Sequence, residues 1–367
     1  MSDEVAYRTI KDMRGVKVSI PDDPQRVVAI SRSLIDTTMY ILGVKDKIVG
    51  GSFYQVPIKQ GQYVWKNKDY TVDTWIGKVI NPRLSEVPNI GAFGSGPYGQ
   101  ISIEAVANCK PDLLILRDFG EAVEDTSKFI SQVESLGIPV FVLKYPSCYA
   151  SPNVNSIYQE IRLLGEIFKQ KRRAGQIVAT MQKAVKDVTL RIQNMPKTEQ
   201  KSVLYFGAPD WAGDKGGVGV AFGTGTIEMA LMEDMIKAKS VYRNFGTNLI
   251  SAEHMLATDP DVIILCTYSG YHPPRKLYGK AYANIQEMRA IKRGRVYALP
   301  ATPCKSERLE LPISLMVAAK AVYPERFIDI DLKKWIHNYI AELYGADEKM
   351  VQRIMNCLML EYLEIIS

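Results

Sequence analysis

The sequence is poor in histidine and cysteine, and it contains no long hydrophobic run. Its 367 residues include 3 histidines and 5 cysteines, with no CxxC pair. His254, His272 and His337 lie far apart in the chain, without the four-residue spacing that is common among zinc ligands. No apolar stretch approaches the ~20 residues that a membrane-spanning helix needs. We therefore expect no metal ion bound by the protein's own side chains and no membrane-spanning helix.

The sequence also lacks the short motifs of the commonest nucleotide-binding and acyl-transfer enzymes. It has no G-x-x-x-x-G-K-[ST], which excludes a typical P-loop, and no G-x-S-x-G nucleophile elbow. In the run Gly217-Val-Gly219-Val-Ala-Phe222, phenylalanine stands where a dinucleotide fingerprint needs its third glycine. We expect no catalytic residues. The glycine-rich run 216–225, which precedes a predicted helix from Thr226, fits an anion-binding turn as well as it fits a plain loop.

The composition is that of an ordinary soluble globular chain of two-domain length. Hydrophobic residues make up 47% and charged residues 23%, and the net charge is +6. So small an excess of positive charge favours anionic ligands without indicating a nucleic-acid partner. The chain begins Met1-Ser-Asp-Glu, without the pattern of a signal sequence. This start fits either a cytoplasmic protein or one whose leader has been replaced.

One short motif occurs twice. Ile101-Ser102-x-Glu104 is followed after six residues by Pro111-Asp112 and an apolar run, and Ile250-Ser251-x-Glu253 is followed in the same way by Pro260-Asp261. A serine that caps a short helix, a glutamate in its first turn and then a buried strand form one helix–strand unit. The presence of this unit in each half predicts two lobes of similar build, each with its own sheet.

Alternating strand and helix patterns predict an α/β protein. Buried strands are expected near 26–31, 113–116 and 140–143 in the first half, and near 202–206, 262–265 and 295–299 in the second. Between them, a helical pattern over 171–194 would span about 36 Å, enough to run between two lobes. We predict two parallel-sheet, Rossmann-like lobes joined by a single long helix: an N-terminal lobe over 1–169, a bridging helix over 170–195 and a C-terminal lobe over 196–367.

The residues that follow strands are the best candidates for a binding site, because ligands of parallel α/β sheets bind outside the carboxyl ends of the strands. Here these residues combine aromatic rings, which pack on planar groups, with guanidinium groups, which bind carboxylates, phosphates and oxyanions. The long irregular stretch 52–100 adds further aromatics and is of a length that tends to be functional. The candidate ligand-binding residues are Arg32, Ser33, Tyr98, Arg117, Tyr145, Trp211, Thr224, Tyr268, Tyr271, Arg275 and Arg308.

Two cysteines also follow strands, Cys148 in the first half and Cys304 in the second. Their positions fit two unrelated loop thiols, a soft-metal ligand or a disulfide between the lobes.

The order and spacing of several motifs resemble the cluster A, or class III, substrate-binding proteins of ABC importers over nearly the whole chain. The segments that carry the resemblance are Val18-Ser-Ile-Pro21, Gln25-Arg-Val-Val28, Val87-Pro-Asn-Ile-Gly91, Ser102-Ile-Glu104, Lys110-Pro-Asp112, Leu136-Gly-Ile-Pro-Val140, Ile250-Ser-x-Glu253, Asp259-Pro-Asp261, Lys292-x-Gly-Arg-Val-Tyr297 and Tyr323-Pro-Glu-Arg-Phe327. Members of this family carry iron–siderophore complexes, haem, corrinoids and, in some cases, molybdate or tungstate.

The resemblance implies a binding protein rather than an enzyme, with no cofactor of its own. Such a protein is extracytoplasmic (periplasmic or at the cell surface), peripheral to the membrane, and in some precursors lipid-anchored. It captures a metal chelate in a cleft between the lobes and delivers it to a membrane permease dimer. Glu104 and Glu253, one in each repeat, would pair with arginines of that permease.

Two alternatives stay open. One is a molybdate- or tungstate-binding protein of the same fold. The other is an enzyme related to chelatases and nitrogenase-like proteins, which needs paired catalytic histidines or cluster-ligating cysteines that this chain lacks.

Overall fold

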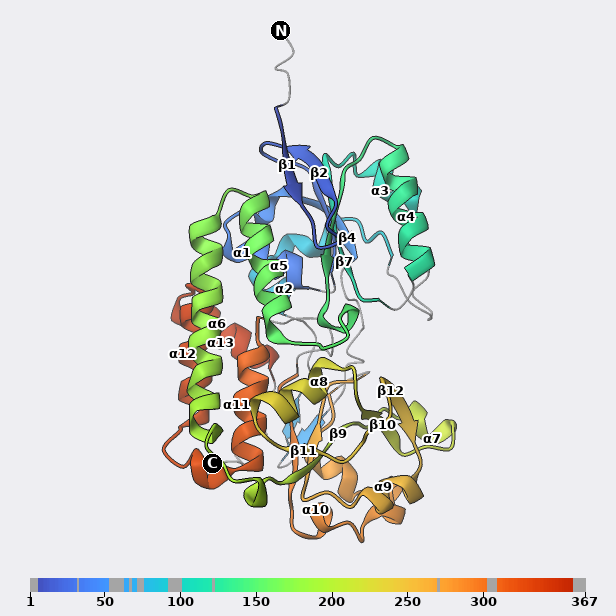
Figure 1. The fold of residues 1–367 in the computed structure, drawn as a ribbon, viewed down its shortest axis with the longest axis vertical. Helices are drawn as coiled ribbons and strands as arrows, with labels where there is room; N and C mark the ends of the chain where they lie inside the picture. Colours follow the sequence, from blue (N-terminus) through green and yellow to red (C-terminus); the bar gives the residue numbers. More distant parts are fainter. Residues whose placement is uncertain are drawn as a thin grey trace. The chain divides into compact units, whose positions relative to one another are not determined.

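The computed structural model describes residues 6–31, 33–52, 63–65, 68–70, 76–91, 101–120, 123–268, 271–301 and 309–358 (Figure 1). These residues form two compact units. The N-lobe contains the described residues within 6–52 and 76–179, and the C-lobe contains those within 63–70, 180–301 and 309–358. Within these ranges, no helix is both long and apolar enough to cross a membrane.

The N-lobe is built on a four-stranded sheet in the order β4-β3-β7-β8, in which all neighbouring strands are parallel. All of β3 and the first five residues of β7 are buried, as expected for parallel strands that are covered on both faces. The strands are β3 (Val27–Ile30), β4 (Ile48–Ser52), β7 (Leu113–Asp118) and β8 (Val140–Lys144), and the helices are α1 (Leu34–Ile41), α2 (Ile76–Ile80), α3 (Ile103–Asn108), α4 (Val123–Ser135) and α5 (Val154–Ile167).

Helix α4 illustrates how the sequence selects the face that covers the sheet. Its buried residues Phe129, Ile130 and Val133 follow helical spacing, whereas the positions between them are exposed. These side chains join Val28 and Leu114 of the strands in the N-lobe core. Burying each such side chain stabilises the lobe by about 1.5–3 kcal/mol.

A β-hairpin, β1 (Tyr7–Lys11) and β2 (Lys17–Pro21), covers one edge of the N-lobe sheet. The Asp12 carboxylate accepts a hydrogen bond from the Val142 N–H (3.2 Å), and the Met13 N–H donates to the Val142 carbonyl oxygen (3.0 Å). The turn of the hairpin therefore pairs with edge strand β8. Covering an edge in this way blocks its pairing with another chain.

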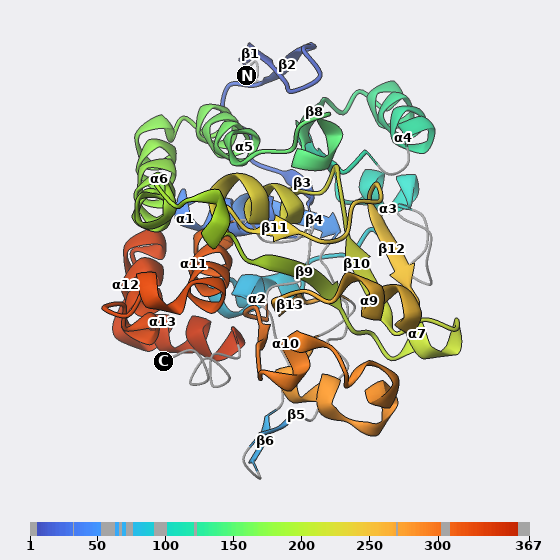
Figure 2. The same ribbon diagram turned by 60° about the horizontal axis from the view of Figure 1, so that its bottom comes forward.

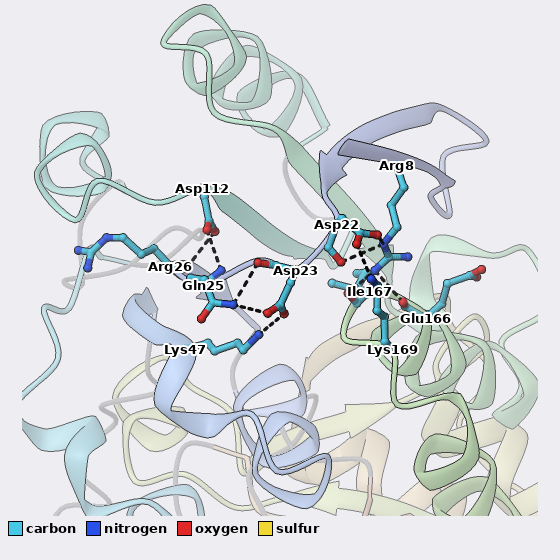
Figure 3. Close-up of polar contacts among 10 residues, drawn as sticks. All are labelled: Arg8, Asp22, Asp23, Gln25, Arg26, Lys47, Asp112, Glu166, Ile167 and Lys169. Carbon is cyan, nitrogen blue, oxygen red and sulfur yellow. Dashed lines mark hydrogen bonds and ion pairs between the residues drawn. The ribbon is translucent and has the colours of Figure 1, made fainter. Parts of the chain in front are cut away.

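Charged side chains fasten this hairpin to the end of α5 (Figure 3). The Arg8 guanidinium donates to the carbonyl oxygens of Glu166 (3.0 Å) and Ile167 (2.5 Å), where the helix dipole favours a cation. Lys169 pairs with Asp22 at 2.5 Å, and this hydrogen bond lowers the pKa of the Asp22 carboxyl. The hairpin is thus fixed to the N-lobe at both its turn and its base.

The C-lobe sheet has the strand order β12-β10-β9-β13-β14, with β11 beside the start of β9. The α/β class is confirmed, and one strand departs from the wholly parallel pattern: β10 runs antiparallel to both neighbours, with Val220 opposite Gly207. The connection from β9 to β10 is short, which suits antiparallel neighbours better than a crossover does. The strands are β9 (Ser202–Gly207), β10 (Gly219–Phe222), β11 (Lys239–Ser240), β12 (Thr247–Ile250), β13 (Val262–Leu265) and β14 (Val296–Ala298).

Helices of very different length surround the C-lobe sheet (Figure 2). Helix α11 (Leu311–Val322) is buried at every residue except Ser314, as its apolar sequence predicts. The other helices are α7 (Trp211–Asp214), α8 (Ile227–Ala230), α9 (Ala252–Thr258), α10 (Arg289–Lys292), α12 (Leu332–Tyr344) and α13 (Glu348–Cys357).

One continuous helix, α6 (Lys171–Ile192), belongs to both lobes. In the N-lobe, Arg173 donates to the carbonyl oxygen of Ile41 (3.4 Å). In the C-lobe, Arg191 pairs with both carboxylate oxygens of Asp329 (2.6 and 2.7 Å). The division between the lobes falls between residues 179 and 180, inside this helix. The domain boundaries at 169/170 and 195/196 stay a prediction.

The stretch 52–100 contains more regular structure than its sequence indicates. A short hairpin, β5 (Tyr63–Trp65) and β6 (Lys68–Tyr70), and the buried helix α2 lie within it. Asn89 pairs with Gly51 at the edge of β4. The aromatic residues Tyr54, Trp75, Phe93 and Tyr98 lie outside the described residues, as does the side chain of Trp65.

Candidate functional sites

The two repeat helices, α3 and α9, each present one glutamate. The Ser102 hydroxyl accepts a hydrogen bond from the N–H three residues on (3.1 Å), and the Ser251 hydroxyl does the same (3.2 Å). Such caps stabilise a helix start by ~1 kcal/mol. Glu104 and Glu253 are exposed in the first turn that each cap fixes. No basic side chain of the described chain lies within ion-pair distance of either carboxylate.

The aspartate that closes each repeat holds the start of the neighbouring strand. Asp112 accepts hydrogen bonds from the N–H groups of Gln25 (2.7 Å) and Arg26 (3.0 Å) ahead of β3 (Figure 3). Asp261 accepts from the N–H (2.9 Å) and the hydroxyl (2.8 Å) of Ser202 at the start of β9. Burial raises the pKa of Asp261, but the two hydrogen bonds from Ser202, with nearby positive charge, outweigh this and lower it. Each Pro-Asp pair therefore fixes its helix against the sheet.

An arginine binds the carboxyl end of each repeat helix. Lys110 and Asp259 stand at equivalent positions and have left-handed φ angles of 44° and 29°, which are uncommon for residues other than glycine. Arg26 Nε donates to the carbonyl oxygen of Lys110 (2.9 Å), and Arg289 Nη2 donates to that of Asp259 (2.5 Å). Both exposed glutamates thus stand on short helices that are fixed at both ends. A helix held in this way can present its carboxylate to a guanidinium group of another protein.

Trp211 and Tyr268 come together beyond the carboxyl ends of β9 and β13. Their ring centroids lie 6.4 Å apart, and the Tyr268 ring also meets Phe222 edge-on at 5.7 Å. Trp211 and Tyr268 are half-buried, whereas Phe222 is buried. Gly207 permits the approach, because a Cβ atom there would lie 2.6 Å from the Cβ of Tyr268. We call Trp211, Tyr268 and Phe222 the aromatic cluster.

His272 and Lys276 fix the loop that carries Tyr268. His272 Nε2 lies 2.8 Å from the Tyr268 carbonyl oxygen, which can only accept, so this nitrogen carries the proton and donates. Burial above all, and then the charge of Lys276, lowers the pKa of His272 to about 4. The ring is therefore neutral at pH 7. Lys276 pairs with Asp210 (2.6 Å), which joins this loop to the segment before Trp211.

Positive charge lies beside the aromatic cluster. Lys215 Nζ is 5.0 Å from the ring centroid of Trp211, a cation–π distance. Arg275, a second predicted cation, is exposed in the turn after the Tyr268 loop. A half-exposed aromatic pair next to the cation of Lys215 is suited to a planar or partly planar anionic ligand.

Two other predicted residues of the C-lobe lie elsewhere. Tyr271 is 4% exposed and belongs to the C-lobe core. Thr224 follows β10, and because β10 is antiparallel to β9, the residues after it lie toward the amino ends of the parallel strands. The sequence-based choice of Thr224 rested instead on the glycine-rich run 216–225 ahead of a predicted helix. The antiparallel direction of β10 keeps Thr224 away from the end of the sheet where Trp211 lies.

In the N-lobe, Ser33 stands where β3 leads into α1. It is buried and has a left-handed φ of 86°. The cap of α1 comes instead from Ser31, whose hydroxyl accepts a hydrogen bond from the N–H of Ile35 (3.0 Å). The carboxyl end of β3 therefore offers small hydroxyl side chains rather than aromatic rings.

Arg117 forms a buried ion pair within the N-lobe. Its Nε and Nη2 atoms donate to the two carboxylate oxygens of Glu160 at 2.5 and 2.8 Å, and both side chains are 0% exposed. The guanidinium also lies 4.8 Å from the ring centroid of Tyr145, itself 1% exposed. The structure thus brings Arg117 and Tyr145 together as packed groups joining β7, β8 and α5. Their contact with a ligand stays a prediction.

The thiol of Cys148 is hydrogen-bonded within the N-lobe and stays protonated. It donates to the carbonyl oxygen of Asp118 (3.3 Å), and burial, followed by the negative charge of Asp118, raises its pKa to about 12. A thiol that stays protonated is a poor metal ligand. The described residues contain no group of three His, Cys, Asp or Glu side chains placed to bind a metal ion. Four predicted residues lie outside the described chain: Arg32, Tyr98, Cys304 and Arg308.

Sequence reasoning missed several groups that shape these sites. Lys215 stands four residues after Trp211, directly after the last residue of the short helix α7, and this spacing is a signal that would have found it. Nothing in the sequence pairs Asp210 with Lys276 or indicates that Arg289 reaches the end of α9, because these contacts depend on the fold.

Comparison with known proteins identifies the family. The chain matches the family described as periplasmic binding protein over residues 27–303, and it therefore belongs to that family.

Individual relatives and a solved structure cover nearly the whole chain. The molybdate-binding protein MolA of Haemophilus influenzae is 23% identical over 94% of this chain and 93% of its own length. The ABC transporter substrate-binding lipoprotein YvrC of Bacillus subtilis is 24% identical over 88% of each. A periplasmic solute binding protein from Veillonella parvula has the same fold, with a TM-score of 0.73 and 19% identity over 99% of this chain and 100% of that one.

Proposed function

We propose that this protein captures a metal chelate of the iron–siderophore, haem or corrinoid type and delivers it to an ABC importer. The observation that carries the ligand class is the aromatic cluster, with Lys215 beside it. Membership of the periplasmic binding protein family supports a solute-binding role outside the cytoplasm. The likeness to a substrate-binding lipoprotein supports a permease partner and a lipid anchor in the natural precursor.

Molybdate or tungstate is the second candidate ligand, favoured by the likeness to MolA. A small tetrahedral oxyanion is bound by N–H and hydroxyl donors rather than by rings. The start of α1, with Ser31 and Ser33, supplies donors of this kind. Under this alternative the half-exposed rings of Trp211 and Tyr268 would have no part in binding.

Tryptophan fluorescence separates the two candidates. We would titrate the protein with ferric siderophores, haem, cobalamin, molybdate and tungstate. The chelate proposal predicts tight binding of a large complex with strong quenching, and Trp211→Phe removes most of that signal. Trp335→Phe is the matched control, because Trp335 stacks on Tyr339 in α12 and should leave the signal unchanged. Tight binding of molybdate or tungstate alone would overturn the proposal. Native mass spectrometry of the protein from its own host would then identify the ligand.

We further propose that Glu104 and Glu253 dock the two lobes onto arginines of the permease dimer. The support is their exposure, their equivalent caps and the fixed ends of their helices. Charge pairs at such a surface set orientation and association rate, so docking should weaken as salt concentration rises. The second lobe docks at high effective concentration once the first is bound.

A further inference from the structure

The C-lobe sheet ends in β12, whose outer edge pairs with no other strand of the described chain. The N-lobe sheet differs, because the hairpin turn pairs with β8 through Val142 and Asn89 pairs with Gly51 of β4. An uncovered edge strand offers main-chain N–H and C=O groups to another polypeptide. The outer edge of β12 is therefore a surface on which a partner can bind.

Two large hydrophobic side chains are exposed in β12 and just before it. Leu249, in β12, is 41% exposed, and Phe245, two residues before the strand, is 81% exposed. Ile250 is buried at 1%, so the alternation of side chains along a strand turns Leu249 to the solvent face. We call Phe245 and Leu249 the apolar edge.

The main chain around Phe245 is held by hydrogen bonds. The Thr224 N–H donates to the Asn244 carbonyl oxygen (3.0 Å), and the Gly246 N–H donates to that of Thr224 (2.8 Å). The Phe245 ring lies against Gly225, where φ is +77° and a Cβ atom would be 2.4 Å from the ring. Because the main chain is held here and one face of the ring rests on Gly225, covering Phe245 costs less conformational entropy than covering a side chain on an unrestrained loop. The last glycine of the run 216–225 thus has a use other than anion binding.

The apolar edge leads directly into the glutamate of α9. β12 ends at Ile250, Ser251 caps the helix and Glu253 is exposed in its first turn. The eight residue steps from Phe245 to Glu253 span roughly 25–30 Å even when fully extended. An interface of standard size covers about 800 Å² of each partner, a patch roughly 30 Å across. One partner can therefore cover both Glu253 and the apolar edge.

We propose that the apolar edge is part of the permease-docking surface and supplies most of the docking affinity of the C-lobe. The inference rests on the proposed docking role of Glu253. Exposed charge pairs contribute little affinity, whereas ordered aromatic side chains that become buried contribute much. The occupant is an apolar segment of the permease beside the arginine that meets Glu253. Glu253 sets the orientation, and Phe245 and Leu249 hold the complex together.

The test measures binding of the ligand-free protein to its importer in lipid nanodiscs. The variants are Phe245→Ser, Leu249→Ser and their combination, with Ile328→Ser as the matched control, because Ile328 is an equally exposed apolar residue of the C-lobe (85%). We expect the double variant to bind at least tenfold more weakly, mainly through faster dissociation, and the control to bind normally. Gly225→Ala should weaken binding as well, because it displaces the Phe245 ring. Melting temperature should change little in the serine variants.

The salt dependence distinguishes this inference from the docking proposal it rests on. Glu253→Gln should reduce the salt dependence of docking, whereas the apolar variants should leave it intact. If Glu253→Gln weakens docking and the apolar variants match Ile328→Ser, the apolar edge is not part of the interface and the inference fails alone. If neither set has an effect, docking through this face of α9 fails too. If the apolar variants change only the oligomeric state in solution, a second copy of this chain covers the edge and the inference is overturned.

Discussion

The two lobes fix the same helix end with the same contact but take the arginine from different places. In the N-lobe the arginine that binds the carbonyl of Lys110 is Arg26, which precedes β3, and in the C-lobe Arg289 of α10 binds that of Asp259. A left-handed residue ahead of a proline turns its carbonyl oxygen away from the helix, where it needs a donor. The comparison teaches that the turn before the proline requires a hydrogen-bond donor for its carbonyl oxygen. The arginine that donates can come from different parts of the fold.

The lobes differ more at the carboxyl ends of their strands. The N-lobe has a fully buried ion pair there, Arg117–Glu160. The C-lobe has a neutral His272 and an ion pair, Lys276–Asp210, of which the aspartate is almost fully exposed. The stability of the N-lobe is therefore sensitive to the loss of the Glu160 charge, whereas the stability of the C-lobe is sensitive to the gain of a positive charge on His272.

The largest expected effect concerns the feature that the lobes share. Replacing both Glu104 and Glu253 by alanine should reduce transport at least tenfold, because both charged anchors of docking are lost. Ligand affinity and melting temperature should barely change. Uptake by reconstituted importer in proteoliposomes measures this effect. The control is Glu124→Ala with Glu348→Ala, two first-turn carboxylates outside the repeat. Normal uptake by the Glu104/Glu253 variant would mean that these residues serve only their helices.

The second prediction breaks the N-lobe ion pair. Glu160→Ala leaves the Arg117 guanidinium buried without its carboxylate and should cost about 3–5 kcal/mol of unfolding free energy. Urea unfolding measures the loss. Glu166→Ala, which removes an exposed partner of Lys171, is the control and should cost less than ~1 kcal/mol. A small loss for Glu160→Ala would show that Arg117 finds water or another acceptor.

The third prediction uses acid to test the C-lobe. The pKa of His272 lies at about 4 in the folded protein against 6.5 ordinarily, so protonation favours the unfolded chain. The contribution of neutral His272 to the free energy of unfolding is therefore complete above pH 6.5. As the pH falls to 4 it is lost, by up to about 3 kcal/mol. His272→Gln should flatten this part of the stability profile, measured by urea unfolding between pH 7 and pH 4. His254→Gln, at an exposed position, should leave the profile unchanged.

The smallest effect concerns the two arginines. Arg26→Ala and Arg289→Ala should each cost about 1–2 kcal/mol, because carbonyl oxygens at a helix end are left to water: those of Cys109 and Lys110 for Arg26, and that of Asp259 for Arg289. Arg289→Ala should cost more, since Arg289 also pairs with the carboxylates of Asp259 (2.8 Å) and Asp261 (3.4 Å). Chemical unfolding of both variants measures the difference. Equal losses would mean that the carbonyl contact alone accounts for the effect.

Much of the fold could be predicted because its elements follow local patterns. The predicted strand at 202–206 appears as β9, and the helix expected over 171–194 appears as α6 over Lys171–Ile192. The direction of β10 could not be predicted, since strand pairing is decided by contacts between distant residues. The helix expected from Thr226 becomes the short α8, which continues into a wider π-type turn at Leu231–Met235.

The candidate sites were predictable to the extent that they follow the repeat. Glu104 and Glu253 occupy equivalent first turns because Ser102 and Ser251 cap both helices. Trp211 and Tyr268 follow parallel strands and do come together. For Arg117, position near the carboxyl end of a strand did not predict its surroundings. Its side chain pairs with Glu160 of a later helix, and no local pattern indicates that partner.

Helix α6 passes from one lobe into the other without a break: its residues up to Ala179 group with the N-lobe, and those from Thr180 on group with the C-lobe. A helix propagates cooperatively, and a single turn standing alone is unstable. If one lobe melts, the half of α6 that it packed loses its tertiary support, and the adjoining turns of the other half fray. The melting of the two cores is therefore linked through one set of main-chain hydrogen bonds. Proteases that cut between Lys171 and Ile192 should act only when this shared segment opens, so resistance to cleavage there reports the integrity of both halves of the molecule at once.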